Sequence, residues 1–438
     1  MPQLTLRLFV LGSLFFLRAP AAQAGDWPQW RGPEGDGIVR DAPLPTEWSE
    51  TKNVLWKTPL PKWGVSTPAI SGEALFLTAQ SEEGALSVLR LNATDGKIVW
   101  TQEVGKADTK REAEKRSVQK FHKLHNNASP SPVTDGKTVV VHFGNGDLIA
   151  LDFAGKQLWK RNLQDDYGPY SIWWGHANSP VIYGDLLISV CMQDTLEGAA
   201  SFTGKPAANY VVAHELATGK VRWYTERKTI AQAEQCDSYT TPVFHKLDGG
   251  KHEMIIMGGN QLDAYDPLDG KLRWQIGGLS GGRLITGPVV AGDRVFATRG
   301  QKGELLSVKL DEAARQGPAD PIAWRHKEST PDTCTPVVVS GRVYTIADSG
   351  IAQCLDAATG KELWKERLPG DYKASVIAAA GKIYLLNKAG LCTVLADGAT
   401  FTKVAENQLD DETLASPAAS NGKLYIRGRD HLYCIGAK

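Results

Sequence analysis

The chain has 438 residues, with 49 basic and 49 acidic side chains and a formal net charge of zero. This length can bury a large core, whereas the balanced charge argues against a nucleic-acid-binding surface or a polybasic membrane patch. Glycine is abundant, at 44 residues, and tryptophan is frequent, at 13. Many glycines with regularly placed aromatic residues indicate short strands and tight turns rather than helices.

The first 24 residues have the pattern of a secretory signal peptide. Arg7 supplies the positive charge, residues 8–17 form a short apolar segment, and Ala22-Gln23-Ala24 matches an A-x-A cleavage site. The apolar segment has about 10 residues, against the roughly 20 that a membrane-spanning helix needs, and no cysteine follows it to carry a lipid. We therefore expect cleavage after Ala24 and a periplasmic or secreted protein without a transmembrane segment.

A repeated unit extends from residue 53 to the C-terminus. Residues 335–364 show it clearly: a Thr-Pro pair, a first apolar strand, a Gly turn, a second and a third strand, a Thr-Gly-Lys turn and a last strand that contains Trp364. We expect the turn glycines, such as Gly96, Gly155, Gly219 and Gly270, to adopt positive φ. The openers of the eight units are Thr67, Ser131, Ser179, Thr241, Gly287, Thr335, Ser375 and Ser416.

A tryptophan marks the outer strand of most units, where its ring can cover the surface between neighbours and its N–H needs a partner. These structural tryptophans are Trp56, Trp100, Trp159, Trp223, Trp274, Trp324 and Trp364. Repeat seven lacks one. The eighth unit ends one strand short, near Cys434, whereas residues 53–57 look like a fourth strand without its first three. We predict that these two ends pair, because this closes the ring and removes exposed edges.

The predicted fold is therefore all-β: an eight-bladed β-propeller of four-stranded antiparallel blades over residues 53–438. The signal peptide (1–24) and an arm (25–52) that packs across a face or the rim precede it. Three segments exceed the minimal repeat and are expected to project from the ring, where insertions often shape a binding surface. They are the charged segment 103–120, which could be helical, and the segments 194–210 and 311–323.

The cysteine spacings do not form a disulfide framework. The six are Cys191, Cys236, Cys334, Cys354, Cys392 and Cys434. Cys354 has the position in its unit that Ala150 has in another, so we interpret the cysteines as small buried side chains.

Polar, acidic and aromatic residues recur just before the first strand of each unit, where a plain turn needs only Gly, Pro and Ser. In a propeller these positions surround one mouth of the central channel, and convergent polar groups beside aromatic rings are typical of small-molecule or glycan sites. The candidate ligand-binding residues are Trp63, His125, Asn127, Trp173, Trp174, His176, Asn178, Asp237, Tyr239, Arg283, Asp332 and Lys373.

Each candidate also has a structural interpretation. Trp173 and Trp174 could stack on a planar or sugar ring, or they could plug the channel. His176 parallels His125 in its own unit, which suggests a shared structural role such as a hydrogen bond to a backbone carbonyl. The aspartates could act as a base, bind calcium or, more commonly, cap turns. His122 and His125 could share a metal, but no third ligand follows at a suitable spacing, so we predict neither a metal site nor a catalytic set.

The units resemble PQQ-like repeats, named after pyrroloquinoline quinone. Residues 354–364 (Cys-Leu-Asp-Ala-Ala-Thr-Gly-Lys-Glu-Leu-Trp) follow the pattern Ala-Leu-Asp-x-x-Thr-Gly-Lys-x-x-Trp. Residues 27–33 (Trp-Pro-Gln-Trp-Arg-Gly-Pro) are also similar to the start of many exported bacterial PQQ-like repeat proteins. The resemblance covers residues 53–438 and implies the propeller fold. WD40 and kelch repeats fit less well, because no unit ends in Trp-Asp.

The resemblance implies two different functions. Quinoprotein alcohol dehydrogenases of this kind hold PQQ and calcium at the centre of the ring and typically have two adjacent cysteines, a pair that this sequence lacks. The propeller subunit of the outer-membrane β-barrel assembly machine has similar repeats, no cofactor and a scaffolding role. That subunit is usually anchored through an N-terminal cysteine, which is also missing here.

We therefore expect an exported, monomeric, non-catalytic propeller without a cofactor, which binds a protein or glycan partner in the cell envelope or in outer-membrane assembly. The alternative is a PQQ- and calcium-dependent alcohol or sugar dehydrogenase. A third hypothesis is a hydrolase or lyase that uses the acidic channel mouth.

Overall fold

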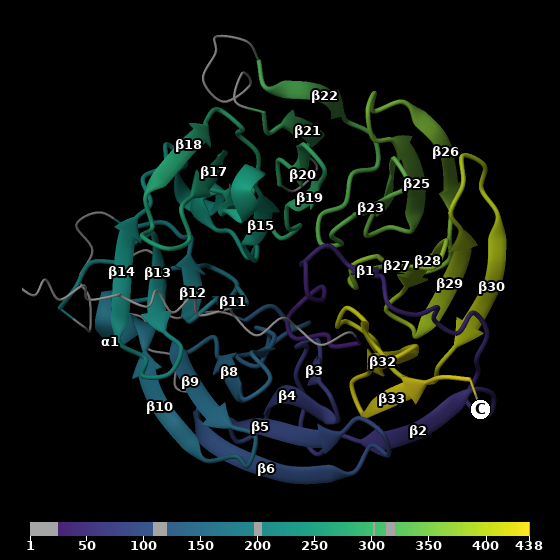
Figure 1. Ribbon diagram of the computed structural model, residues 1–438, viewed down its shortest axis with the longest axis horizontal. Coiled ribbons are helices and arrows are strands. Elements are labelled where there is room, and N and C mark those ends of the chain that lie inside the picture. The colour runs from purple at the N-terminus through teal and green to yellow at the C-terminus, as the bar shows by residue number, and fades with distance from the viewer. Residues whose placement is uncertain (1–24, 108–120, 197–203, 301–302, 312–319, 438) are drawn as a thin grey trace, which may run out of the picture.

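The computed structural model describes residues 25–107, 121–196, 204–300, 303–311 and 320–437. These residues form eight four-stranded antiparallel sheets arranged as blades around a central channel (Figure 1). The predicted eight-bladed propeller is confirmed. Each blade begins at the channel with its shortest strand and ends with its fourth strand on the outer rim, so the predicted Ser/Thr-Pro openers all lie at the channel.

The strands of the first four blades follow the chain in order. Blade 1 contains β3 (Ala69–Ser71), β4 (Ala74–Gln80), β5 (Ala85–Asn92) and β6 (Ile98–Lys106). Blade 2 contains β7 (Val133–Thr134), β8 (Thr138–His142), β9 (Asp147–Asp152) and β10 (Gln157–Asn162). Blade 3 contains β11 (Val181–Tyr183), β12 (Leu186–Cys191), β13 (Tyr210–Glu215) and β14 (Val221–Glu226). Blade 4 contains β15 (Val243–Lys246), β16 (His252–Gly258), β17 (Gln261–Tyr265) and β18 (Leu272–Ile276).

The remaining blades complete the ring. Blade 5 contains β19 (Val289–Ala291), β20 (Arg294–Thr298), β21 (Leu305–Lys309) and β22 (Ile322–His326). Blade 6 contains β23 (Val337–Val339), β24 (Arg342–Ile346), β25 (Ile351–Asp356) and β26 (Glu362–Arg367). Blade 7 contains β27 (Ile377–Ala379), β28 (Lys382–Leu386), β29 (Leu391–Ala396) and β30 (Lys403–Gln408). The short helical segments are α1 (Leu163–Tyr167), η1 (Ala233–Cys236) and η2 (Asp248–Gly250).

The two ends of the propeller domain close the ring, as predicted. Blade 8 contains β31 (Ala418–Ser420), β32 (Lys423–Arg427) and β33 (His431–Ile435), and its outer strand is β2 (Val54–Pro59) from the other end of the chain. β2 pairs antiparallel with β33, and Trp56 lies opposite Cys434. A further short strand, β1 (Ile38–Val39), adds in parallel to the inner edge of β27. These two pairings join segments about 340 to 380 residues apart.

The hydroxyl groups of the openers join neighbouring blades at the channel. In five places an opener's backbone N–H donates to the hydroxyl of the next opener: Thr67 to Ser131 (3.0 Å), Ser131 to Ser179 (2.9 Å), Gly287 to Thr335 (2.9 Å), Thr335 to Ser375 (3.0 Å) and Ser375 to Ser416 (3.0 Å). A buried N–H without a partner is costly. The hydroxyl is therefore the physical reason for Ser or Thr before the proline, a reason that the sequence pattern alone did not reveal.

The outer-strand tryptophans join the blades at the rim. Six of the seven predicted ones donate their indole N–H to a backbone carbonyl of the next blade: Trp56 to Ala93 (3.3 Å), Trp100 to Phe153 (3.1 Å), Trp159 to Leu216 (2.8 Å), Trp223 to Pro267 (3.2 Å), Trp324 to Ala357 (3.0 Å) and Trp364 to Gly398 (3.2 Å). Trp274 instead donates to the buried carboxylate of Glu253 in its own blade (2.9 Å). The predicted inter-blade role is thus confirmed for six positions.

The turn glycine of the next blade lies against each of several tryptophan rings. Gly270 has φ +71°, and a Cβ on it would lie 2.4 Å from Trp223. Gly96, Gly155 and Gly219 have φ of +73°, +89° and +68°, which confirms the predicted positive φ. The glycine is therefore required twice, for the left-handed turn and for the close approach of the indole.

We expect Gly270→Ala to lower the free energy of unfolding by about 2–4 kcal/mol, because it combines left-handed strain with a collision against the Trp223 ring. Gly184 is a matched control: it has φ +61°, but no atom lies within 4 Å of the place that a Cβ would take. Gly184→Ala should cost only the strain, about 1–2 kcal/mol. Urea unfolding of both variants measures the difference, and equal losses would show that the indole contact adds nothing.

Blade 7 replaces its missing tryptophan with the arm. Ala405 has the strand position of the tryptophans and packs on a buried cluster that includes Leu44 and Trp48. Asn407 fixes this part of the arm, because its amide accepts from the Trp48 backbone N–H (2.8 Å) and donates to the Thr46 carbonyl (3.0 Å). The arm is thus part of the rim packing of blade 7.

Two further predictions concern the charged segment and the cysteines. Residues 103–106 of the charged segment continue β6 as strand rather than helix, since charged side chains on an outer strand can face solvent. The remainder of that segment, 108–120, and residues 197–203 and 312–319 of the other two insertions lie outside the described residues. All six cysteines are buried, as expected of small core side chains, and burial raises the pKa of the Cys354 thiol to about 11.

Candidate binding site at the channel mouth

The arm crosses one end of the central channel. Trp27 exchanges two backbone hydrogen bonds with Ile70 at the inner edge of blade 1 (2.9 and 2.8 Å), and the Pro28 carbonyl accepts from Thr134 of blade 2 (2.9 Å). The arm then reaches blade 7 through β1. Figure 1 shows this purple segment in the middle of the ring. The arm therefore bridges three blades at the channel.

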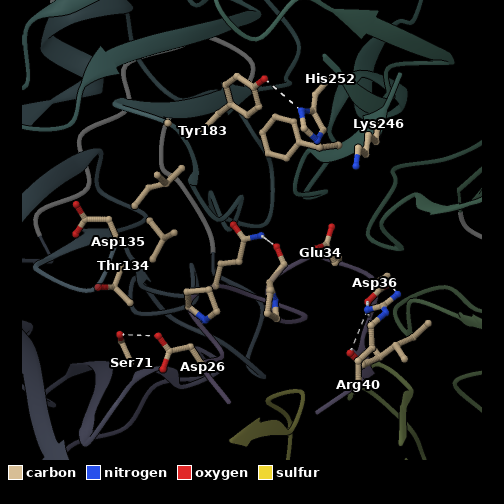
Figure 2. A pocket seen from close by; sticks show the side chains of 18 of the residues that line it. Asp26, Glu34, Asp36, Arg40, Ser71, Thr134, Asp135, Tyr183, Lys246 and His252 are labelled. Carbon is tan, nitrogen blue, oxygen red and sulfur yellow. Dashed lines mark hydrogen bonds and ion pairs between the residues drawn. The ribbon is translucent and has the colours of Figure 1, made fainter. Parts of the chain in front are cut away.

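A broad depression of about 1350 Å³ lies beside the arm at this end (Figure 2). Several of its polar side chains already bond to one another or to the backbone. Asp26 accepts from the Ser71 hydroxyl (2.9 Å) and the Gly72 N–H (2.8 Å), Asp36 pairs with Arg40, and Tyr183 bonds His252 (3.3 Å). These groups hold the arm and the turns in place, and we do not assign a ligand to them.

Arg31 fastens the arm to blades 6 and 7. Its guanidinium is fully buried and donates to the carbonyls of Val376 (3.0 Å), Pro336 (2.6 Å), Asp36 (2.6 Å) and Thr335 (3.4 Å). Burial lowers the pKa of Arg31 to about 10, which leaves it charged at neutral pH. One side chain thus satisfies several carbonyls that the ring alone leaves open.

We expect Arg31→Met to release the arm while the ring stays folded, because four carbonyls lose a charged donor that contributes about 1.5–3 kcal/mol per hydrogen bond. Limited proteolysis should then cut within residues 25–52 at a protease concentration that leaves the parent protein intact. Arg40→Met is the control, since Arg40 is half exposed and reaches only its own segment. An arm that stays resistant in the Arg31 variant would contradict this role.

The opposite end of the channel contains a pocket of about 590 Å³. Its lining includes six of the predicted ligand-binding residues: His125, Trp174, Tyr239, Arg283, Asp332 and Lys373. The strands β3, β7, β11, β15, β19, β23, β27 and β31 start here, which explains the convergence of residues that are up to about 250 positions apart. These six residues therefore line one pocket, and their role in ligand binding stays a prediction.

The other six predicted residues lie outside the pocket lining, and most have structural contacts. Asn127 bonds Gln80 (3.1 Å), His176 bonds the Val190 carbonyl (3.3 Å), and Asn178 donates to the carbonyls of Ser238 (3.1 Å) and Thr240 (2.8 Å). The carbonyl bond of His176 is the structural role suggested for it.

Asp237 is buried and accepts from the backbone N–H of Trp173 (2.8 Å). This bond positions the loop that carries both Trp173 and Trp174. Trp63 lies under the guanidinium of Arg429, at 5.0 Å. The side chains of Asp237 and Trp63 therefore contact loops at this end of the channel and lie outside the pocket lining.

Two ion pairs hold the charged side chains of one wall of the pocket, which Arg283, Asp332 and Lys373 line. Arg283 pairs with Asp332 (3.0 Å) and Lys373 with Asp348 (2.6 Å). Asp348 also accepts from the N–H groups of Asp332 (3.1 Å) and Thr333 (3.0 Å). Burial raises the pKa of Asp332, although Arg283 opposes the shift.

Aromatic side chains form the other walls. Trp174 donates its indole N–H to Glu234 (3.1 Å) and meets the rings of Trp173 (6.3 Å) and His122 (5.6 Å) edge-on. Burial, followed by the charges of Lys373, Lys123 and Arg283, lowers the pKa of His122, so its ring is neutral at neutral pH. Trp174 thus lines the pocket, whereas Trp173 contacts the Trp174 ring and lies outside the pocket lining.

The sequence reasoning missed Trp30 and Glu234, which also line the pocket. Trp30 comes from the arm, so the arm contributes a side chain to this pocket. The available signal was the motif Trp27-Pro-Gln-Trp-Arg-Gly-Pro33, whose second tryptophan had no assigned partner.

The donor set of the pocket does not suit a calcium ion. The carboxylates of Asp332 and Asp348 already have cationic partners, and Glu234 accepts from an indole. Among the described residues, no three His, Cys, Asp or Glu side chains are placed to hold a metal ion. A search of the same part of the chain for a helix able to cross a membrane found none.

The fold and the repeat pattern define a PQQ-like-repeat propeller. The family model described as outer membrane protein assembly factor BamB matches residues 38–203, 127–332 and 317–403. These matches cover most of the chain, which therefore belongs to this family.

Individual relatives agree with this assignment. The outer membrane protein assembly factor BamB of Yersinia pestis is 24% identical over 380 residues, 83% of this chain and 84% of that protein. That of Salmonella typhimurium is 30% identical over 141 residues, 32% of this chain and 34% of that protein.

Solved structures share the fold at low identity. BamB from Moraxella catarrhalis has a TM-score of 0.58 at 13% identity and covers 87% of this chain and 99% of its own. A europium-containing methanol dehydrogenase has 0.62 at 11% identity, with 93% and 91% covered. The quinohemoprotein alcohol dehydrogenase of Comamonas testosteroni has 0.63 at 12% identity, with 97% and 82% covered. The assembly factor and the dehydrogenases have similar TM-scores, so the fold alone does not choose between their functions.

Proposed function

We propose that this chain is an exported, non-catalytic scaffold that binds a protein partner during the assembly of outer-membrane proteins. The observation that carries the proposal is the match to the outer membrane protein assembly factor of Yersinia pestis, which extends over 84% of that protein. Export is supported by the signal-peptide pattern of residues 1–24. Binding and scaffolding need no catalytic set, in agreement with the ion-paired carboxylates of the channel mouth.

The outer rim offers a surface for a protein partner. Large apolar side chains are exposed at the start of the outer strand in four consecutive blades: Val99 (51% exposed), Leu158 (44%), Val221 (44%) and Leu272 (49%). Each lies one or two residues before the structural tryptophan of its strand. Exposed apolar side chains that gather into one patch are typical of interaction surfaces, and we propose that these four contribute to such a patch. We define Val99, Leu158, Val221 and Leu272 as the rim row.

The rim row can be tested with charge substitutions. We expect Leu158→Glu, Val221→Glu and Leu272→Glu in one chain to abolish co-purification with the host's outer-membrane assembly machinery, because a buried carboxylate without a partner is costly. Val404→Glu is the matched control, since Val404 is 41% exposed on the outer strand of blade 7, outside the rim row. Both variants should melt at the temperature of the parent protein.

Undiminished co-purification of the triple variant would remove the rim row from the proposal. Loss of co-purification in the Val404 control as well would show that surface charge, not a specific contact, is responsible.

The dehydrogenase alternative makes a different prediction. A quinoprotein should bind PQQ with calcium, rise in melting temperature with ligand concentration, and reduce a dye with an alcohol. The ion-paired carboxylates of the pocket lead us to expect no shift at a large excess of PQQ and calcium. A saturable shift with dye reduction would replace the scaffold proposal.

A further inference from the structure

Trp30 of the arm lines the channel pocket together with residues of the ring. The position of a Cβ on Gly287 lies 3.2 Å from the Trp30 ring, so glycine at this one opener makes room for the indole. The buried Arg31 holds this part of the arm. A volume of about 590 Å³ is within the range of small-molecule sites, about 300–1,000 Å³.

Hydroxyl groups surround the pocket. Five openers line it: Thr67, Ser131, Ser179, Thr241 and Ser416. The hydroxyls of Ser131 and Ser179 accept from the N–H of the preceding opener. A hydroxyl has one proton to donate and two lone pairs, so each of these two retains hydrogen-bonding capacity. The pocket can therefore bond a ligand that carries several hydroxyls.

An aromatic platform and two cations stand at the mouth. Trp174 is oriented by its bond to Glu234 (3.1 Å), and Tyr239 lies beside it in the lining. Arg283 has five N–H donors and Lys373 three, and each gives one to a carboxylate in the pairs described above. The pocket lining also contains the carboxylates of Asp332 and Glu234, which already bond to Arg283 and to the Trp174 indole.

We infer that this pocket binds an acidic saccharide, a pyranose ring that carries a carboxylate. The C–H face of a pyranose is apolar and stacks on an indole, its edge hydroxyls match the Ser and Thr openers, and its carboxylate matches the spare N–H donors of Arg283 and Lys373. A neutral sugar leaves those donors unused, and a flat aromatic acid leaves the hydroxyls unused. The inference is independent of the rim row and of the proposed scaffold function.

The test uses a matched pair of ligands, cellotriose and its C6-oxidised form, cellotriuronic acid, which differ only in the three carboxylates. Titration of the purified protein, followed by tryptophan fluorescence and calorimetry, should show saturable binding of the acid and binding of the neutral sugar weaker by about tenfold or more. Equal affinities, or no saturable binding of the acid, would overturn the inference.

Two variants and one control locate the site. Arg283→Gln and Trp174→Ala should each weaken binding of the acid by about tenfold or more, and either suffices if the other does not fold. Arg299→Gln is the control, because Arg299 pairs with Glu304 outside the pocket lining. Unchanged affinity in a folded pocket variant, or an equal loss in the control, would place binding elsewhere. PQQ, an aromatic tricarboxylate, is the third ligand, and tighter binding of PQQ than of the acid would also overturn the saccharide assignment.

Discussion

Asp263→Asn is expected to lower the free energy of unfolding by about 3–5 kcal/mol, because it leaves a buried arginine without its counter-charge. Asp263 accepts from Arg227 (2.6 Å), and the two side chains are 0% and 1% exposed. Gln261 (3.1 Å) and Tyr265 (3.1 Å) donate to the same carboxylate oxygen. Arg227 in turn donates to the Gly258 carbonyl (2.6 Å), so the pair joins β14 of blade 3 to blade 4.

Chemical unfolding checks this prediction. The double variant Arg227→Met with Asp263→Asn should be more stable than the single Asp263 variant, since no unpaired charge stays buried. Asp269→Asn removes the exposed partner of Lys271 and should leave the unfolding midpoint unchanged. A small loss in the Asp263 variant, or an additive loss in the double variant, would contradict the account of a charge trapped between blades.

The protein is expected to lose stability steeply between about pH 6.5 and pH 5, because buried histidines must be protonated on unfolding. Burial lowers the pKa of His125, His176 and His214 to about 4 and that of His142 further below its usual value. His142 and His176 pack with Tyr170 between blades 2 and 3, with centroids 4.6 Å apart for the two imidazoles. The imidazoles of His142 and His176 therefore pack between blades 2 and 3 in their neutral form.

The direction follows from the two states. Above pH 6.5 the histidines are neutral in both states, so they cost nothing. As the pH falls, the histidines of the unfolded chain bind protons, whereas the buried histidines of the folded protein stay neutral. The free energy of unfolding therefore falls until about pH 4. A shift from 6.5 to about 4 corresponds to roughly 3 kcal/mol per histidine at the low end of this window.

Urea unfolding at several pH values between about 7.5 and 5 measures the effect, in a window where carboxylates contribute little. The midpoint should fall with pH, and His176→Asn should reduce the slope by about one proton. A midpoint that is constant down to about pH 5 would contradict neutral burial of these rings.

The sequence was most informative where one feature repeats. The eight openers and the seven outer-strand tryptophans recur at the same places within the repeated unit because every blade must cover its neighbours, so the ring and its closure by β2 could be predicted. The arm does not repeat. Arg31 finds its carbonyl partners about 300 to 345 residues away, and no local pattern predicts such contacts. The arm was predicted to lie on a face or the rim, but not to contribute Trp30 to the channel pocket.

The sequence predicted which residues lie near the channel mouth, but it did not predict which of their side chains line the pocket. Position within the repeat brings Arg283, Asp332 and Lys373 to the channel mouth, because all first strands start there. Position does not fix the direction of a side chain. Asn178 stands at an equivalent place in its unit, yet its amide donates to the carbonyls of Ser238 and Thr240 in the loop before β15. Side-chain direction depends on which backbone groups need partners, and the repeat pattern does not contain that information.

We propose above that this propeller serves outer-membrane protein assembly as a scaffold. The most direct measurement is the amount of folded outer-membrane β-barrel protein in the native host after deletion of the gene, scored by the gel shift between heated and unheated samples. We expect less folded barrel protein in the deletion strain. The full-length parent chain and the Val404→Glu chain should restore it, whereas the triple rim-row variant should not. Unchanged folded barrels in the deletion strain would contradict the proposal.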